Sequence, residues 1–166
     1  MNKWARFFRH LTATRWQVTR CFPASSMHAI RDAIRASESR HMGELRFAVE
    51  AGLDPARILA GTSSRQRALQ VFAQLGVWDT EHNSGVLIYL LLADRKVEIV
   101  ADRGIHARVG EAGWATICHE MERHFHAGRF EEGALHGIAA ISELLQQHFP
   151  AQGSKRNELP DRPAIL

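Results

Sequence analysis

The sequence predicts a layered α/β/α sandwich built on a small mixed sheet. Three observations predict it: a size that suits one core, strand-like segments that follow helix-like ones, and one uniformly apolar run. The chain has 166 residues, of which 45% are hydrophobic and 23% charged, which suits a single globular domain. The run from Gly85 to Ala93 lacks polar alternation, so we expect a central strand covered by helices on both faces. The expected order along the chain is α-α-β-α-β-β-α-α.

Cap and turn residues divide the first half of the chain. A basic amphipathic helix is expected within residues 1–22, and a second helix ends near Gly43, because glycine favours helix exits. Residues 44–50 alternate apolar and mostly polar side chains, which predicts a strand with one wet face. After a short helical turn, the next helix is capped by residues 62–64 and ends at Gly76.

The second half of the chain is predicted to be a hairpin followed by two helices. A polar Asp-Arg break separates the central strand from a return strand over residues 97–101. Apolar stripes over residues 114–125 and 135–149 predict the two helices. The expected organisation is a basic helix at residues 1–22, an α/β domain at 23–150 and a tail at 151–166.

Basic residues are concentrated at the N-terminus. Residues 1–20 hold five bases and no acid, whereas the whole chain has 21 Lys and Arg against 18 Asp and Glu. The rest of the chain therefore has 16 bases against 18 acids, so we expect no nucleic-acid surface. Charged residues interrupt the N-terminal sequence before the apolar segment of a signal peptide can form. No apolar segment approaches the ~18 residues that a membrane-spanning helix needs. We expect a cytoplasmic protein, whose one possible membrane contact is peripheral and N-terminal.

The N-terminal helix has two explanations. Its apolar stripe contains Trp4, Phe7 and Phe8 and is flanked by basic residues. The stripe either packs on the protein's own body or on a second subunit, or it contacts a protein partner or a membrane surface through residues 1–20. The pattern leaves both explanations open.

The motifs of several common enzyme classes are missing. The chain contains no GxSxG, P-loop or GxGxxG sequence. Cys21 and Cys118 are too far apart for a disulfide framework or a thiolate zinc site. His119 and His124 are five positions apart, which does not match the spacing of a zinc-protease helix. We therefore expect no zinc.

Polar residues gather at one predicted edge of the sheet. A strand-helix-strand unit makes a right-handed parallel crossover, so the first two strands begin at the same edge and the return strand ends there. Calcium and magnesium prefer carboxylate and amide oxygens. The sequence therefore predicts a divalent cation site formed by Glu44, Asp79, Glu81, Asn83, Asp102 and Glu111. The alternative, equally open, is that these residues line solvated loops.

Several ordered segments carry a resemblance to a known family. They are Leu69 to Gly76, Asn83-Ser84-Gly85-Val86-Leu87, Asp94-Arg95-Lys96-Val97, Gly104, and Phe125 through Gly128-Arg129-Phe130 to Gly133. Together they resemble the TPM domain, which occurs in bacterial membrane-associated proteins and in a chloroplast thylakoid protein of photosystem II repair. The resemblance spans residues 24–150 and implies an α/β sandwich with a mixed sheet.

The resemblance also has implications for activity. Plant members are described as acid phosphatases, and some bacterial members bind calcium or magnesium through an acidic cluster. By position, Glu44, Asn83, Gly85 and Arg95 correspond to family residues at the first strand, before the central strand and in the hairpin. The chain departs from the family at Gly110-Glu111, where an aspartate is common, and shows no secretory signal or transmembrane helix.

Two functional hypotheses follow. In the first, the protein is a non-enzymatic interaction or assembly module that associates with membrane proteins, and any bound ion is structural. In the second, it is a divalent-cation-dependent, acid-phosphatase-like hydrolase in which Arg103 offsets developing charge. The sequence shows no nucleophile next to a base, which favours the first hypothesis.

Overall fold

The structure is a computed structural model that describes residues 3–153 and 156–166. Its elements are α1 (Lys3–Leu11), α2 (Arg15–Cys21), α3 (Ala24–Glu38), β1 (Glu44–Glu50), α4 (Pro55–Leu59), α5 (Ser64–Gln74), β2 (Gly85–Leu91), the 3₁₀ turn η1 (Leu92–Asp94), β3 (Lys96–Ala101), α6 (Arg103–His126), α7 (Phe130–His148) and β4 (Ala164–Ile165). The predicted α/β sandwich with a mixed sheet is confirmed. No helix in the described ranges is both long and apolar enough to cross a bilayer.

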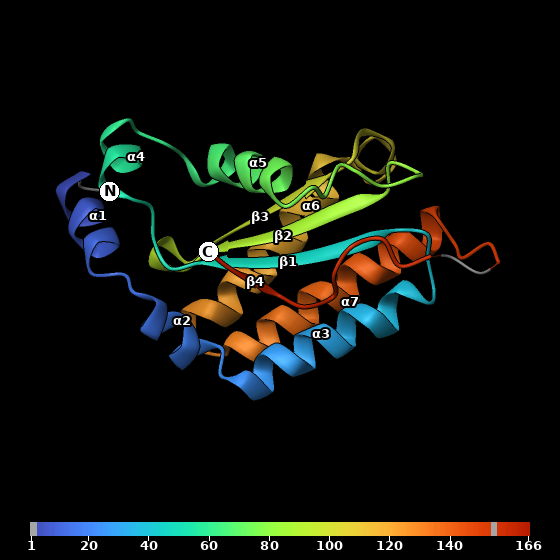
Figure 1. Cartoon of the computed structure of the whole chain (residues 1–166), viewed down its shortest axis with the longest axis horizontal. Helices are drawn as coiled ribbons and strands as arrows, with labels where there is room; N and C mark the ends of the chain where they lie inside the picture. Colours follow the sequence, from blue (N-terminus) through green and yellow to red (C-terminus); the bar gives the residue numbers. More distant parts are fainter. Residues whose placement is uncertain (1–2, 154–155) are drawn as a thin grey trace.

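The sheet has the strand order β3-β2-β1-β4. β1 runs parallel to β2 and β4, and β3 runs antiparallel to β2. Glu44 pairs with Gly85, and Val86 pairs with Ala101. The starts of β1 and β2 therefore share one edge with the end of β3, and the carboxyl ends of β1 and β2 lie at the opposite edge, near α1 (Figure 1).

Helices cover both faces of the sheet (Figure 1). On one face, Phe47 and Ile88 belong to the larger apolar core, to which α3, α6 and α7 contribute. On the other face, Leu87 and Leu91 pack with Ala68 of α5 in a second, smaller core. All seven residues of β2 are buried, which explains why this strand has no polar alternation.

The N-terminal segment differs from the single helix expected over residues 1–22. The chain forms α1 and α2 with a break between them, and the backbone N–H of Thr14 donates to Gln17 Oε1 (3.2 Å) at the start of α2. In an uninterrupted helix, this N–H group would instead donate to a backbone carbonyl one turn earlier. Residues 1 and 2 of the expected helix lie outside the described part of the chain. We refer to α1 and α2 together as the arm.

The C-terminal segment also differs from expectation, because its end is not a tail. Ala164 and Ile165 form β4 and pair with Ala48 and Val49 of β1. The Nη1 atom of Arg46 donates to the backbone oxygens of Pro160 and, at 2.7 Å, of Arg162. The segment thus completes the sheet on the side of β1.

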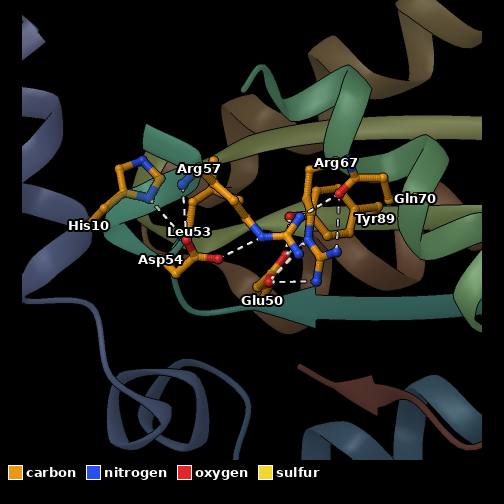
Figure 2. Close-up of polar contacts among 8 residues, drawn as sticks. All are labelled: His10, Glu50, Leu53, Asp54, Arg57, Arg67, Gln70 and Tyr89. Atoms are coloured by element: carbon orange, nitrogen blue, oxygen red, sulfur yellow. Dashed lines mark hydrogen bonds and ion pairs between the residues drawn. The ribbon is translucent and has the colours of Figure 1, made fainter. Parts of the chain in front are cut away.

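A buried ion pair fastens α5 to the sheet (Figure 2). The Nε atom of Arg67 on α5 lies 2.8 Å from Oε2 of Glu50 at the end of β1, and Tyr89 of β2 donates its hydroxyl to the same oxygen at 2.5 Å. Burial raises the pKa of Tyr89 strongly, and the Glu50 carboxylate raises it further. Tyr89 is therefore a permanent hydrogen-bond donor at neutral pH.

We expect Arg67→Met to lower the free energy of unfolding by about 3–5 kcal/mol, because it leaves the Glu50 carboxylate buried without a cation. The matched control is Arg57→Met. Arg57 pairs with Asp54 in a solvent-exposed contact, which is worth about 1 kcal/mol or less. Urea denaturation measures both variants, and equal losses would contradict a structural role for the buried pair.

Candidate functional site

The structure brings part of the predicted acidic cluster together at the edge where β1 and β2 begin. Glu44 is fully buried there, and its backbone N–H donates to the Ser84 carbonyl at 2.9 Å. Asp102 follows β3 and accepts a hydrogen bond of 2.8 Å from the N–H of Gly85. The loop 79–84 lies at the same edge, with Asp79, Glu81 and Asn83 exposed, and Arg103 is exposed at the first position of α6. We call this edge the acidic rim.

Two carboxylates of the acidic rim, the buried Glu44 and the half-buried Asp102, bind backbone groups. Oε2 of Glu44 accepts hydrogen bonds from the backbone N–H groups of Glu158 and Leu159 at 3.2 and 3.1 Å. Glu158 in turn accepts from the N–H of Glu81 at 3.0 Å. Burial raises the pKa of Asp102, and its hydrogen bond from Gly85 opposes that rise. Glu44 and Asp102 thus satisfy backbone donors that a sheet edge and the C-terminal segment would otherwise leave without acceptors.

Glu111 lines a groove whose lining includes none of the other predicted ligands. It follows Gly110, whose φ of 78° interrupts α6, and it lines this groove beside β3 together with Lys96 and Trp114. Among residues 3–153 and 156–166, no three His, Cys, Asp or Glu side chains are grouped so that they could hold a metal ion. A calcium or magnesium site on the acidic rim stays a prediction.

At the opposite edge, the carboxylate of Asp94 holds the arm. Its Oδ2 lies 3.0 Å from Nε of Arg6, and its Oδ1 contacts Arg9 and lies 3.1 Å from Nε2 of His10. The Nδ1 atom of His10 accepts a hydrogen bond of 2.9 Å from the backbone N–H of Leu53. Because Nδ1 is an acceptor, Nε2 carries the ring proton, and it lies close to the Asp94 carboxylate.

The contacts of Asp94 keep its carboxyl group ionised in the neutral pH range. Burial acts to raise the pKa of Asp94, but its hydrogen bonds with His10, Arg9 and Arg6 outweigh burial and hold the pKa well below its usual range. A carboxyl group whose pKa is lowered by folding stabilises the folded state fully when the pH is above its unfolded pKa of about 3.9. This stabilisation is lost as the pH falls from there through the folded pKa. Asp94 is thus an anion throughout the physiological pH range.

The arm turns large apolar side chains outward. The exposed fractions are 67% for Trp4, 61% for Phe8 and 64% for Trp16, and Leu11 is also exposed. Phe7 is half-buried, and its ring centroid lies 6.3 Å from that of Trp4 and 6.0 Å from that of Phe8. The body therefore covers Phe7 in part and leaves the others in solvent. We call Trp4, Phe8, Leu11 and Trp16 the aromatic face.

A groove between the arm and the body contains functional candidates that sequence reasoning missed. Arg20 and Trp16 of α2 are the missed candidates, and they line it together with Arg95, which the family resemblance had already singled out in the hairpin. Arg95 is far from Trp16 and Arg20 in sequence, so no local spacing pattern connects it to them. A general signal did exist, because ligands of open α/β sheets usually lie beyond the carboxyl ends of parallel strands, and β2 leads directly to this edge.

Neither cysteine is activated for nucleophilic chemistry. Burial raises the pKa of the Cys21 thiol in spite of the opposing charges of Arg95 and Arg20. Burial, together with the charge of Glu98, raises the pKa of the Cys118 thiol to about 12. Both side chains are therefore neutral thiols at neutral pH, and a thiol is a much weaker nucleophile than a thiolate.

Comparison with known proteins places the chain in a family. The family model described as the TPM domain matches residues 19–144, which include the sheet strands β1 to β3 and helices α3 to α6. The chain belongs to the TPM domain family. The match leaves α1 and the first four residues of α2 outside it.

Two solved structures resemble this TPM domain. The BA42 protein from the psychrophilic bacterium Bizionia argentinensis is 30% identical, with a TM-score of 0.76 over 87% of this chain and 94% of that chain. The N-terminal domain of a protein from P. gingivalis is 22% identical, with a TM-score of 0.60 over 76% of this chain and 77% of that chain, which shows a common fold. A search of curated proteins gave no match.

We expect Glu44→Ala to destabilise the protein by about 1–3 kcal/mol, because the substitution removes the acceptor of two backbone N–H groups in the C-terminal segment. Amide hydrogen exchange at Glu158 and Leu159 should also accelerate. Asp79→Ala is the control, since Asp79 is exposed on the same rim. If both variants had the stability of the parent, Glu44 would have no role in holding the segment.

Proposed function

We propose that this TPM domain is a non-enzymatic interaction module whose arm binds an anionic membrane surface, where it also meets membrane proteins. The observation that carries the proposal is the exposure of the aromatic face on an arm that the body holds in place. Tryptophan and phenylalanine favour the boundary between lipid headgroups and acyl chains. An exposed aromatic cluster on a rigid support needs little ordering when it binds.

The charge of the arm supports an anionic surface. Arg15 and Arg20 are exposed on α2 beside Trp16, and the arm contains no acidic residue. Each basic side chain near an anionic membrane contributes about 1 kcal/mol to binding. Apolar and basic side chains together supply the two signals that stable peripheral binding requires.

The arrangement of charge in the molecule favours one orientation. The arm lies at one end of the sheet, and the acidic rim lies at the other (Figure 1). An anionic surface attracts the basic end and repels the acidic end. The domain would therefore bind with the arm toward the lipid and the acidic rim toward the solvent. There the exposed side chains of Asp79, Glu81 and Asn83 would be accessible to a calcium or magnesium ion with a structural role.

The hydrolase alternative has less support. Glu44 and Asp102 already accept backbone hydrogen bonds, and neither cysteine is a thiolate at neutral pH. A cation-dependent phosphatase would need carboxylates that are available to hold the ion, along with an activated water or nucleophile. We therefore assign the acidic rim no catalytic role in this proposal.

We expect the double substitution Trp4→Ala/Phe8→Ala to weaken binding to vesicles containing phosphatidylglycerol by at least about tenfold. The physical reason is the loss of two aromatic side chains, each worth about 1.5–3 kcal/mol on full burial, where 1.4 kcal/mol corresponds to tenfold. Vesicle co-sedimentation at a fixed salt concentration measures the effect.

The matched control is Trp78→Ala, which removes a tryptophan that is 55% exposed and outside the arm. Vesicles of phosphatidylcholine alone test the role of charge and should bind the parent protein more weakly. Two outcomes would contradict the proposal: no binding of the parent protein to anionic vesicles, or equal binding by the double variant and the control.

A further inference from the structure

The arm and the body enclose a groove that lies beyond the carboxyl end of β2. Its volume is about 470 Å³, within the range of about 300–1,000 Å³ that is typical of ligand pockets. It is lined by side chains of α1, α2 and the link between them, of η1 and the residue after it, and of the end of α6 and the start of α7. Five of the twelve lining residues belong to the arm, most of which lies outside the family match.

The groove has an excess of positive charge. Arg9, Arg20 and Arg95 line it, and Asp94 is the acid among the lining residues. That acid already contacts two guanidinium groups and a histidine from α1. Within the described ranges of the chain, neither Arg20 nor Arg95 forms an ion pair with a carboxylate.

The backbone at Arg95 supports a role for this side chain. Arg95 has a φ of 49°, a left-handed conformation that glycine and asparagine adopt with less strain than other residues. Within residues 3–153 and 156–166, its guanidinium makes one hydrogen bond, a long one of 3.5 Å to the carbonyl oxygen of His126. Residues in strained backbone conformations are concentrated at active sites and ligand-binding sites.

The groove also has an aromatic wall. The Cζ atom of Arg20 lies 5.4 Å from the centre of the Trp16 ring, and Phe130 lines the groove as well. A guanidinium held against an aromatic ring keeps its planar edge available, and that edge matches the oxygens of a phosphate group. The lining thus combines donors for an anion with a surface for an apolar group.

We propose that this groove binds a phosphate group carried on an apolar body, with the headgroup of an anionic lipid as its source. The two guanidinium groups of Arg20 and Arg95 hold the phosphate oxygens, and Trp16 contacts the apolar part. The inference that the phosphate belongs to a lipid rests on the proposed function, whereas the inference that the groove binds a phosphate group does not. A soluble phosphate ester has the same chemistry, and the experiment distinguishes the two.

The test uses the full chain and two soluble probes. Dihexanoylphosphatidylglycerol is titrated below its micelle concentration, and inorganic phosphate is titrated separately, with ¹H–¹⁵N NMR as the readout. Because the short-chain lipid forms no bilayer, its binding does not depend on insertion of Trp4 and Phe8 into a membrane. We expect shifts at the Trp16 indole N–H and at the backbone of Ala93 to Arg95.

The variants are Arg95→Asn, which suits the left-handed backbone, and Arg20→Gln. Each should weaken binding of the short-chain lipid by about tenfold, the loss expected for a hydrogen bond to a charged group. The control, Arg123→Gln, removes an exposed arginine of α6 outside the groove and should leave the affinity unchanged.

The two probes separate the sources. Binding of the short-chain lipid at least tenfold tighter than inorganic phosphate supports the lipid headgroup, whereas equal binding of both, with the same dependence on Arg20 and Arg95, supports a soluble phosphate ester in the same groove. The absence of shifts in the groove at millimolar concentrations of both probes would overturn the proposal. Shifts that persist unchanged in both variants would overturn it as well, and neither result depends on whether vesicles bind the aromatic face.

Discussion

The carboxylate of Asp94 is the contact on which one end of the molecule depends. It sits in η1, only 7% exposed, where Arg6, Arg9 and His10 of α1 meet it. The backbone N–H of Leu53 donates a hydrogen bond to the His10 imidazole, so α1 is attached to the segment after β1 as well as to η1. Without this anion, the bases of the arm would repel one another beside Arg95. With it, the arm lies on the body, turns the aromatic face to solvent and forms one wall of the groove.

Charged groups have different roles at the two ends of the sheet. At the acidic rim, Glu44 and Asp102 are directed inward to backbone donors, so their main measurable role is structural. At the opposite edge, Asp94 neutralises part of the arm, while Arg20 and Arg95 keep their charge unpaired by any carboxylate in the described part of the chain. The acids thus maintain the fold, and the bases are available to an anionic partner. This division agrees with an interaction module more closely than with a metal-dependent hydrolase.

Local patterns in the sequence were sufficient to predict the core but not the site. The uniform apolar run of β2, the serine cap of α5 and the glycine after it depend on near neighbours, and the structure confirms all three. The acidic rim was predicted as an edge, but the sequence did not show that residues 158 and 159 fold over Glu44. Arg6 and Asp94 are 88 positions apart, so their contact depends on the tertiary fold. Helical periodicity in the sequence carries no information about such a contact. The apolar end of the chain, Ala164 to Leu166, was the available signal for β4.

The measurement that tests the central claim most directly is amide hydrogen exchange at Leu53 in Asp94→Asn. The Leu53 N–H is buried and bonded to His10 of the arm, so its exchange rate reports whether the arm is docked. We predict exchange at Leu53 and through α2 at least about tenfold faster than in the parent, since the substitution removes the negative charge that pairs with Arg6 and Arg9. The amides of β2 should be unchanged, and Asp79→Asn, a substitution of an exposed aspartate, should have no effect at Leu53. Unchanged exchange at Leu53 in Asp94→Asn would contradict the account, because the arm would then be held by something other than this carboxylate.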